Sequence, residues 1–304
     1  MMRKEKIFKA FGTVNSIIIY EDNQAILDMM ASYVNELDDK WSLFKSDSLV
    51  CQINAQAGIG WVKVDDDTLS LLKLAKRCSK ESEGAFSITS WPLNQLWKKA
   101  IKNGQMPDAK LVLKRKALVN DDDLLIDEVT RTVSLRKTGQ GIDLGGIAKG
   151  YALDKAREML VDAGISDAII NFGGSVSLIG KKRRIGIQNP NKLTGVPVGS
   201  LDLIDESVVT SGDYERNVNA NGHFIHHIVD PNSGYPSVSG IKSLTLIGSN
   251  AAILDAFSTA CFVQGCDLAV GFIQKLKLDA IIINEKMDVL CTPGIRGNFA
   301  LGAN

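Results

Sequence analysis

Residues 143–156, DLGGIAKGYALDKA, place a carboxylate, glycines and a lysine where a strand is expected to turn into a helix. Glycines let a backbone approach anionic oxygens closely, and the amino terminus of a helix offers free N–H groups with partial positive charge. Lys149 adds a full positive charge. The spacing matches neither the P-loop nor the G-x-G-x-x-G fingerprint. The stretch therefore fits a phosphate-binding bend, although spacing alone favours a tight turn whose glycines adopt positive φ.

A second candidate pair, Asp255 and Thr259, lies in LDAFSTACFVQG (254–265). On a helix this spacing points both oxygens to one side. A carboxylate and a hydroxyl form a partial shell for Mg²⁺, which prefers oxygen ligands and keeps waters or substrate phosphates. Taken alone, the pair favours a structural role, in which Asp255 offsets the helix dipole and Thr259 bonds back to a carbonyl. Cys261 is predicted to be a core residue.

All three histidines lie in HFIHHIVDPNSGYP (223–236). In a strand His226 and His227 point to opposite faces, so they do not easily share one metal ion with His223. One histidine facing a site is predicted instead. The run from Asp230 to Gly234 is a strong turn signal.

The composition is that of an ordinary globular protein. The chain has 304 residues, of which 45% are hydrophobic and 23% are charged. Its 35 acidic and 35 basic residues balance, so no overall field favours nucleic acid, and we expect no nucleic-acid partner. Two basic runs, at 114–116 and 181–184, are short and are predicted to be solvated turns.

The cysteines and the amino-terminal sequence indicate the cellular compartment of the protein. The five cysteines are odd in number and form no C-x-x-C pair, which argues against a disulfide framework or a thiolate zinc site. The amino-terminal MMRKEKIFKAFGT is basic but has no apolar core of a signal peptide. No stretch reaches the roughly eighteen apolar residues of a membrane-spanning helix. We expect a cytoplasmic protein without a transmembrane segment, or an exported one whose signal has been removed.

Hydrophobic periodicity predicts strands and helices that interleave without a linker. Strands are predicted at 13–20, 167–172, 184–188, 198–203, 224–229, 242–248 and 279–284, with a hairpin at 124–136. Helices are predicted at 22–38 (with Met29 on its apolar face), 68–80, 147–163, 251–264 and 266–276, and a short helix with a loop is predicted within 91–103. The polar stretches 171–180 and 210–218 are predicted to be turns. The pattern predicts an α+β fold in one domain, 1–304, with mixed or antiparallel sheets, packed helices and intertwined subdomains.

The order of these motifs resembles that of the ApbE family of flavin transferases across nearly the whole chain. FGT (11–13) resembles the family's early M-G-T, and KWSLFKSDSLVCQIN (40–54) resembles its M-S-x-Y-x-x-D-S segment. GAFSITSWPLNQLW (84–97) resembles G-A-F-D-I-T-x-G-P-L-x-x-L-W. The motifs DLGGIAKGYALD, NFGGS, TSGDYER, HHIVDPNSGYP and DAFSTACFVQG then follow in the family's order.

The resemblance implies a T-fold-like architecture and an FAD:protein FMN transferase. Such an enzyme binds FAD as its substrate together with Mg²⁺, moves FMN onto a Thr or Ser hydroxyl of an acceptor protein, and releases AMP. By the same resemblance Asp255 and Thr259 are side-chain metal ligands, and Gly146 gives a backbone carbonyl. The positions implied to contact FAD are Phe11, Phe44, Ala85, Phe86, Ser87, Asp143, Lys149 and Val229.

The chain departs from the family pattern at four of these positions. Ser87 stands where the family usually has an aspartate, which removes a carboxylate beside the nucleotide. Phe11 replaces Met, and Phe44 replaces Tyr, keeping an aromatic face without the hydroxyl. Gly146 replaces the commoner Ala or Thr, a mild change for a ligand that acts through its backbone.

The implied reaction defines roles for the charged residues. Attack at a pyrophosphate builds charge on phosphoryl oxygens, which Mg²⁺ and Lys149 neutralise. A weakly acidic hydroxyl needs a base, for which Asp255 and His227 are the hypotheses.

The same site fits an FAD pyrophosphatase that uses water and yields FMN and AMP. A non-catalytic FAD-binding protein is a further alternative, against which the metal-ligand pair argues.

Overall fold

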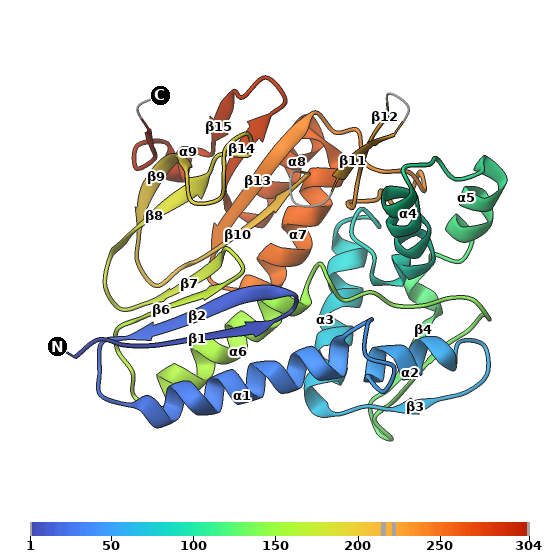
Figure 1. The fold of residues 1–304 in the computed structure, drawn as a ribbon, viewed down its shortest axis with the longest axis horizontal. Helices are drawn as coiled ribbons and strands as arrows, with labels where there is room; N and C mark the ends of the chain where they lie inside the picture. The colour runs from blue at the N-terminus through green and yellow to red at the C-terminus, as the bar shows by residue number, and fades with distance from the viewer. Residues whose placement is uncertain (1, 214–216, 221–222, 303–304) are drawn as a thin grey trace.

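The structure, a computed structural model, describes residues 2–213, 217–220 and 223–302 (Figure 1). Its helices are α1 (Gln24–Trp41), α2 (Leu49–Ala55), α3 (Asp66–Glu81), α4 (Trp91–Asn103), α5 (Ala109–Lys116), α6 (Ala148–Asp162), α7 (Ala251–Gln264), α8 (Cys266–Leu276) and α9 (Pro293–Arg296), with short 3₁₀ turns η1 (Ile88–Ser90) and η2 (Asp121–Asp123). Its strands are β1 (Lys4–Ala10), β2 (Thr13–Ile19), β3 (Val62–Lys63), β4 (Leu124–Asp127), β5 (Thr132–Leu135), β6 (Ala168–Phe172), β7 (Ser175–Ile179), β8 (Arg183–Gln188), β9 (Pro197–Leu203), β10 (Ser207–Gly212), β11 (Asn217–Ala220), β12 (His223–His226), β13 (Ile241–Gly248), β14 (Asp279–Asn284), β15 (Val289–Cys291) and β16 (Ala300–Leu301).

The largest sheet has the strand order β1-β2-β6-β7-β10-β13-β14-β15, and the smaller sheets are β16-β9-β8, β3-β5-β4 and β11-β12. Every strand pairing within the described ranges is antiparallel. Figure 1 shows α1 and α6 along one face of the large sheet, with α7 beside the central strands and α4 and α5 farthest from the amino terminus. The predicted α+β class with antiparallel sheets is confirmed.

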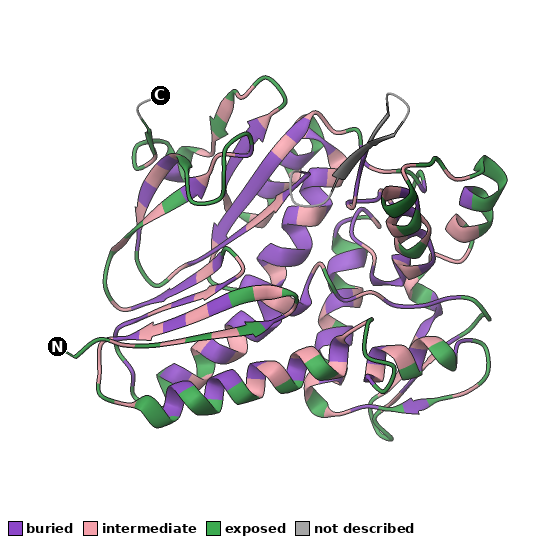
Figure 2. Ribbon diagram, in the orientation of Figure 1, coloured by how far each residue is buried: buried purple, intermediate pink, exposed green. Residues whose placement is uncertain are grey.

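The central strands of the large sheet are buried on both faces, whereas the edge strand β1 exposes one face (Figure 2). Successive strand residues point to opposite faces, so Val209 and Leu246 enter the core with α1, α3, α6 and α7, whereas Val208 and Ile247 enter a second cluster. That second cluster joins the sheet to β8 and β9 through Ile187 and Leu201, among other residues. This double burial explains the consecutive apolar residues of β14, whose Ala280 to Ile283 are all buried.

Two hairpin turns lie at one end of the large sheet. Phe11 and Gly12, with φ of 53° and 70°, connect β1 to β2, and Gly173 and Gly174, with φ of 59° and 97°, connect β6 to β7. Because β2 pairs with β6, the turns are neighbours, and a Cβ on Gly173 would lie only 2.7 Å from Thr13 Oγ1. The FGT and NFGGS motifs are therefore adjacent in space.

Helices α6 and α7 are fastened to each other by paired carboxylate contacts. The Asp154 carboxylate of α6 accepts the N–H groups of Ala251 and Ala252 at 2.8 and 2.9 Å, at the amino terminus of α7. In return, Asp255 Oδ2 of α7 accepts the Gly150 N–H in the first turn of α6 at 3.0 Å. The backbones approach so closely that a Cβ on Gly150 would lie 2.2 Å from the Ala251 carbonyl oxygen.

Most predicted elements exist, and their errors have local causes. The prediction for 91–103 was too short, because the whole range is helical in α4. The strand expected at 224–229 ends at His226, and Val229 makes only an isolated bridge to Pro236. The predicted turns at 171–180 and 210–218 include β7 and the end of β10, while residues 214–216 lie outside the described part. Met29, predicted on the apolar face of its helix, is 54% exposed because Leu27, Ala31 and Leu37 complete that face.

The described helices do not include one that is both long enough and apolar enough to cross a lipid bilayer.

We expect Gly150→Ala to destabilise the fold strongly. The added methyl group cannot fit against the Ala251 carbonyl oxygen, so α6 and α7 must separate, at a loss of about 3 kcal/mol or more. Urea unfolding measures this loss. The matched control is Gly271→Ala in α8, where no atom lies within 4 Å of the new Cβ and where helix propensity predicts a gain of about 0.5–1 kcal/mol. Equal stabilities of the two variants would contradict the tight contact.

Candidate active site

The three positions predicted to hold a metal lie together at the amino end of α6. A Cβ built on Gly146 would lie 3.5 Å from Thr259 Oγ1 and 3.3 Å from the Phe86 ring. Asp255, one turn before Thr259 on α7, is buried with its carboxylate on the Gly150 N–H. Asp255 and Thr259 therefore lie on the same side of α7, the side that faces the glycine bend.

A backbone carbonyl and a serine hydroxyl hold the Thr259 side chain in place. Its Oγ1 lies 3.3 Å from the Asp255 carbonyl oxygen, as the structural reading of the sequence predicts, and 3.3 Å from Ser211 Oγ. Ser211, in β10, also lies 2.8 Å from Ser258 Oγ. Because a hydroxyl that coordinates a cation through its oxygen must direct its hydrogen elsewhere, Ser211 and the Asp255 carbonyl are suitable acceptors.

The glycines of the bend allow neighbouring residues to pack closely against its backbone. Gly145, Gly146 and Gly150 do not adopt positive φ, so the expected explanation for them was wrong. Each is instead limited by space, with neighbours in Asp143, Phe86 and Ala251 respectively. The expected strand before the helix is also absent, because β5 ends at Leu135 and an irregular segment leads from it to α6. The bend is therefore a loop held by its neighbours.

Asp143 anchors this loop. Its Oδ1 accepts the Gly145 N–H at 2.9 Å, and its Oδ2 accepts Asn94 Nδ2 of α4 at 3.0 Å. The Lys98 ammonium lies 3.5 Å from the same Oδ2. The carboxylate is only 11% exposed, so these contacts tie the bend firmly to α4.

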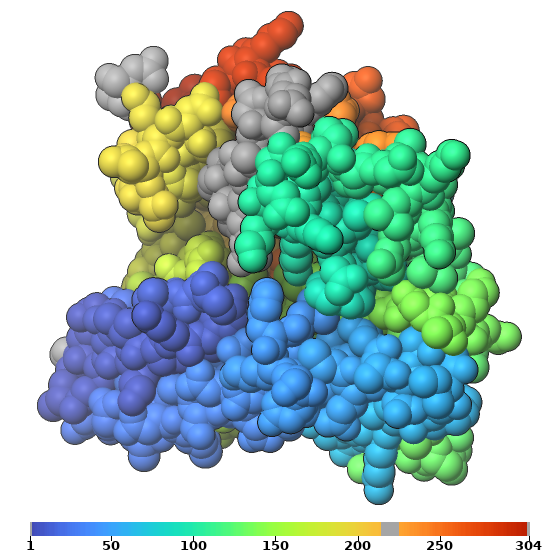
Figure 3. All heavy atoms as spheres, turned by 45° about the vertical axis from the view of Figure 1, so that its right-hand side comes forward, coloured from blue at the N-terminus to red at the C-terminus, as the bar shows by residue number. Residues whose placement is uncertain are grey.

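Lys98 also lies over two aromatic rings. Its Nζ is 5.7 Å from the centroid of Phe44 and 5.1 Å from that of Trp91, within the range of cation–π attraction. Phe44 itself is 84% exposed. Figure 3 shows the surface hollowed between the blue amino-terminal segments, the teal α4 region and the yellow β8–β9 region.

The segment from Ala85 to Ser87 packs beside the bend. Ala85 and Phe86 are buried, and Ser87 Oγ donates to Asp121 Oδ1 of η2 at 2.7 Å. The Thr89 N–H and hydroxyl bond the same oxygen. A carboxylate is thus present next to Ser87, although residue 87 does not supply it.

Phe11 packs against a pair of buried aromatic side chains. Its ring stacks on Trp41 with centroids 6.4 Å apart, and Trp41 meets Tyr151 of α6 edge-on at 5.6 Å. The Tyr151 hydroxyl donates to Asp67 of α3. The first hairpin turn is therefore held against α1 and α6, close to the helix that follows the bend.

The two described imidazole side chains differ. His226 is buried, with Nε2 2.8 Å from the Ser237 carbonyl and Nδ1 accepting the Ile228 N–H, which together define a neutral ring. Burial lowers the pKa of His226, in the direction that favours the same neutral ring. His227 is half-buried, directly after β12. The His223 side chain lies outside the described part of the chain.

Lys149 and Val229 complete the predicted set. Lys149 is half-buried in the first turn of α6, and its ammonium pairs with no carboxylate of the described ranges. Val229 is buried in a small cluster with Trp97 of α4. Lys149 therefore remains a cation available to an anionic ligand, whereas the Val229 side chain is committed to packing.

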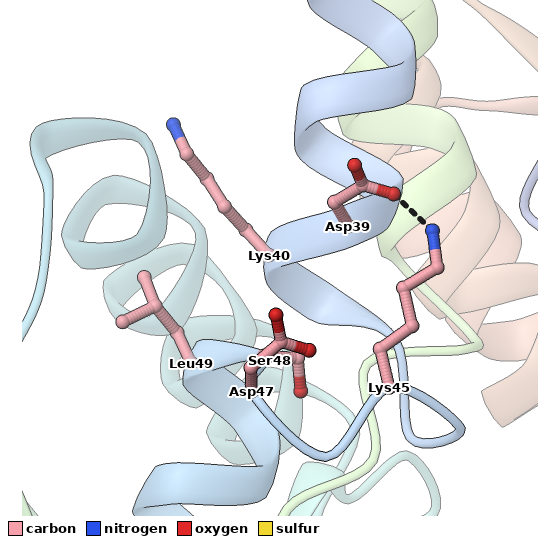
Figure 4. A pocket seen from close by; sticks show the side chains of 6 residues that line it. All are labelled: Asp39, Lys40, Lys45, Asp47, Ser48 and Leu49. Atoms are coloured by element: carbon pink, nitrogen blue, oxygen red, sulfur yellow. Dashed lines mark hydrogen bonds and ion pairs between the residues drawn. The ribbon is translucent and has the colours of Figure 1, made fainter.

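A separate hollow lies beside the loop that carries Phe44 (Figure 4). It is lined by Asp39, Lys40, Lys45, Asp47, Ser48 and Leu49. Lys45 pairs with Asp39, and Lys40 pairs with Glu36 and Asp65 at 2.6 Å each. Because both lysines are neutralised and no predicted site residue lines the hollow, it is not the substrate site.

The donors at the bend fit a hard cation. Asp255, Thr259 and the Gly146 carbonyl offer oxygens only, the ligand type of Mg²⁺, and waters or phosphates would complete its shell. Among the described residues no group of three or more His, Cys, Asp or Glu side chains could hold a metal ion, so a zinc-like cluster has no support there.

Comparison with known proteins agrees with this geometry. The ApbE family model matches residues 11–282, so the chain belongs to the ApbE family. It is 32% identical over 283 residues to an FAD:protein FMN transferase of Klebsiella pneumoniae (strain 342), covering 93% of this chain and 89% of that protein. It is 28% identical over 310 residues to one of Treponema pallidum (strain Nichols), covering 93% and 85%.

Solved structures share the fold. The crystal structure of the ApbE protein of Thermotoga maritima superposes with a TM-score of 0.89 at 30% identity, covering 98% of this chain and 99% of that one. The flavin transferase ApbE of Vibrio cholerae gives a TM-score of 0.84 at 22% identity, covering 98% and 99%, which supports the fold alone. The predicted family, fold class and enzyme class are confirmed.

Sequence reasoning missed the residues that support the predicted ones. These are Asn94, Lys98, Asp121, Asp154 and Ser211. Asp154 carried a usable signal, because it lies four residues after Gly150 on the same helix. Asn94 and Lys98 are likewise four residues apart on α4, whereas Asp121 and Ser211 carry no spacing signal.

Asp154 gives a pH prediction. Burial raises the pKa of Asp154 to about 6, against the opposing effect of the two N–H groups that it accepts. Because the folded state then binds this proton more tightly than the unfolded chain, the contribution to stability is complete below about pH 4 and is lost as pH rises through about 6. We expect Asp154→Asn to gain up to about 3 kcal/mol relative to wild type between those limits.

Urea unfolding at a series of pH values measures this difference. Asp162→Asn, at the exposed end of the same helix, is the matched control. An Asp154→Asn variant whose stability runs parallel to wild type from pH 4 to 7 would contradict the raised pKa.

Proposed function

We propose that this chain transfers FMN from FAD to a Thr or Ser hydroxyl of an acceptor protein, with Mg²⁺ and with release of AMP. The observation that carries the proposal is the meeting of Asp255, Thr259 and Gly146 at the glycine bend. The curated relatives named FAD:protein FMN transferase support the same reaction.

In this proposal the bend receives the pyrophosphate of FAD. Its small residues let phosphate oxygens approach the backbone at the amino terminus of α6, the positive end of the helix dipole. Lys149, half-buried in that turn, binds a phosphoryl oxygen. Mg²⁺ at Asp255, Thr259 and Gly146 would supply charge neutralisation at the phosphates.

The proposed reaction exchanges one bond to phosphorus for another. The acceptor hydroxyl oxygen bonds to the phosphorus of FMN, the bond from that phosphorus to the bridging oxygen breaks, and the bridging oxygen leaves with AMP. The hydroxyl proton passes to a base and then to solvent.

Of the two hypotheses for the base we favour His227. Asp255 is already engaged by the Gly150 N–H and, in the proposal, by the metal, so its lone pairs have other partners. The imidazole of His226 is closed by Ser237 and Ile228, which leaves His227 as the histidine of this segment suited to the task.

The direct test is to incubate the protein with FAD, Mg²⁺ and candidate acceptor proteins. We expect an acceptor to gain the mass of FMN on Thr or Ser and AMP to appear in equal amount. Asp255→Asn should reduce the rate by about a hundredfold or more, and chelation of the metal should do the same. Free FMN and AMP without an adduct would instead support the pyrophosphatase.

Lys149→Ala should weaken FAD binding by about tenfold, because one charge-assisted contact with phosphate is lost. Titration of FAD fluorescence measures the affinity. Lys155→Ala is the matched control, since Lys155 lies on the same helix but pairs with Glu158 and covers the Tyr151 ring. Equal FAD affinities of the two variants would show that Lys149 does not contact the substrate.

A further inference from the structure

Helices α4 and α5 carry an unusual local excess of positive charge. Within 91–116 the acidic side chains are limited to Asp108, which caps α5. The basic residues of this range are Lys98, Lys99, Lys102, Lys110, Lys114, Arg115 and Lys116. We call this pair of helices the basic lobe. Its charge stands out because the whole chain is neutral.

Most of this charge has no carboxylate partner in the described parts of the chain. Lys98 pairs with Asp143, whereas the six other cations form no ion pair there. Cations elsewhere often do pair, as Lys73 does with Glu128, and Arg184 with Asp202. The lobe is therefore a region where the protein itself leaves positive charge uncompensated.

The fold turns these cations outward. The inner faces of α4 and α5 pack through Leu93, Trp97, Ala100 and Val112. Figure 1 shows α5 as an outlying helix beside α4, and Figure 2 shows their outer turns coloured as exposed. The short run at 114–116, predicted to be a solvated turn, is instead the last turn of a helix that joins a larger charged surface.

A purely structural explanation covers only part of the charge. Lys102 and the run at 114–116 lie in last turns, where cations stabilise the helix dipole. Lys110 lies in the first turn of α5, where a cation opposes the dipole, and Lys99 lies in the interior of α4. Helix stability therefore does not account for the lobe as a whole.

Apolar side chains are interspersed with the exposed charges. Leu111 is 38% exposed, Leu113 is 61% exposed, and Met106, in the connection between the helices, is 41% exposed. Cations mixed with aliphatic groups suit a protein surface better than the phosphate backbone of nucleic acid, which is bound mainly through charge and polar contacts.

The lobe borders the candidate active site. Asn94 and Lys98 of α4 hold Asp143 at the glycine bend. On the other side, Trp97 Nε1 donates to the Gly234 carbonyl at 2.8 Å, and the Lys116 stem lies against Gly234. In Figure 3 the teal atoms of this region stand at the rim of the hollow.

We infer that the basic lobe is the docking face for the acceptor protein, and that the acceptor presents an acidic, partly apolar surface to it. The inference rests on the proposed transferase reaction, which needs a protein acceptor to approach this rim. Complementary charge would speed and orient the encounter before the hydroxyl enters the site.

The test uses binding, so that it does not depend on turnover. The probes are a fluorescent glutamate-rich peptide with interspersed leucines, its glutamine-for-glutamate counterpart, and a DNA duplex of equal charge. We expect the acidic peptide to bind wild type more tightly than either other probe. Its affinity should fall on the order of tenfold as NaCl rises from about 0.05 to about 0.3 M.

A charge-reversal variant locates the binding. It combines Lys99→Glu, Lys102→Glu, Lys110→Glu and Lys114→Glu, and it should bind the acidic peptide at least about tenfold more weakly. The control combines Lys63→Glu, Lys80→Glu, Lys275→Glu and Lys286→Glu, which are exposed, change the charge equally and include last-turn lysines of α3 and α8. The control should bind like wild type.

FAD affinity, measured in both variants, separates this inference from the proposed function. Normal FAD binding with the peptide lost only in the lobe variant supports docking at the lobe. Equal peptide binding by both variants, tighter binding of the duplex, or no preference for the acidic peptide would overturn it, whatever the outcome for FMN transfer. If the lobe variant fails to fold, the affinity of wild type for the acidic peptide at low and high NaCl is the test, and an affinity that does not fall with salt would overturn the inference.

Discussion

The contact between α6 and α7 is the constraint on which the candidate site depends. Asp154 of α6 holds the amino terminus of α7, and Asp255 of α7 holds an N–H in the first turn of α6. The absence of a side chain at Gly150 lets the helices approach until backbone touches backbone. Because each carboxylate lies on the helix opposite to the N–H it accepts, neither helix can slide or rotate without breaking both contacts. The predicted metal ligands inherit their positions from this arrangement.

The large sheet brings the remaining motifs to the same place. Its antiparallel order sets the β1–β2 and β6–β7 turns side by side, and Ser211 near the end of β10 directs its hydroxyl to Thr259. Segments far apart in the sequence thus surround one bend. Asp143 then fixes the bend to α4, so the position of the outlying basic lobe is also tied to the site.

The sequence was informative where chemistry and periodicity are local. Asp255 and Thr259 are one helical turn apart, so their shared direction follows from helix geometry alone. The partners of the supporting residues could not be found in this way, because those contacts depend on folding. Ser211 meets Thr259 across 48 residues, and Asp154 meets Ala251 across 97. The glycines were recognised as special for the wrong reason, since crowding by a partner helix leaves no trace in the local pattern.

The contact between Ser87 and Asp121 has a consequence for how this chain is compared with its relatives. By its resemblance to the family pattern, residue 87 carries a neutral hydroxyl where an aspartate is usual. In three dimensions a negative group still occupies that neighbourhood, delivered from 34 residues downstream and held by a serine, a threonine and the backbone. Positions 87 and 121 therefore have to be considered together when this chain is compared with its relatives, because Asp121 supplies beside Ser87 the carboxylate that residue 87 lacks.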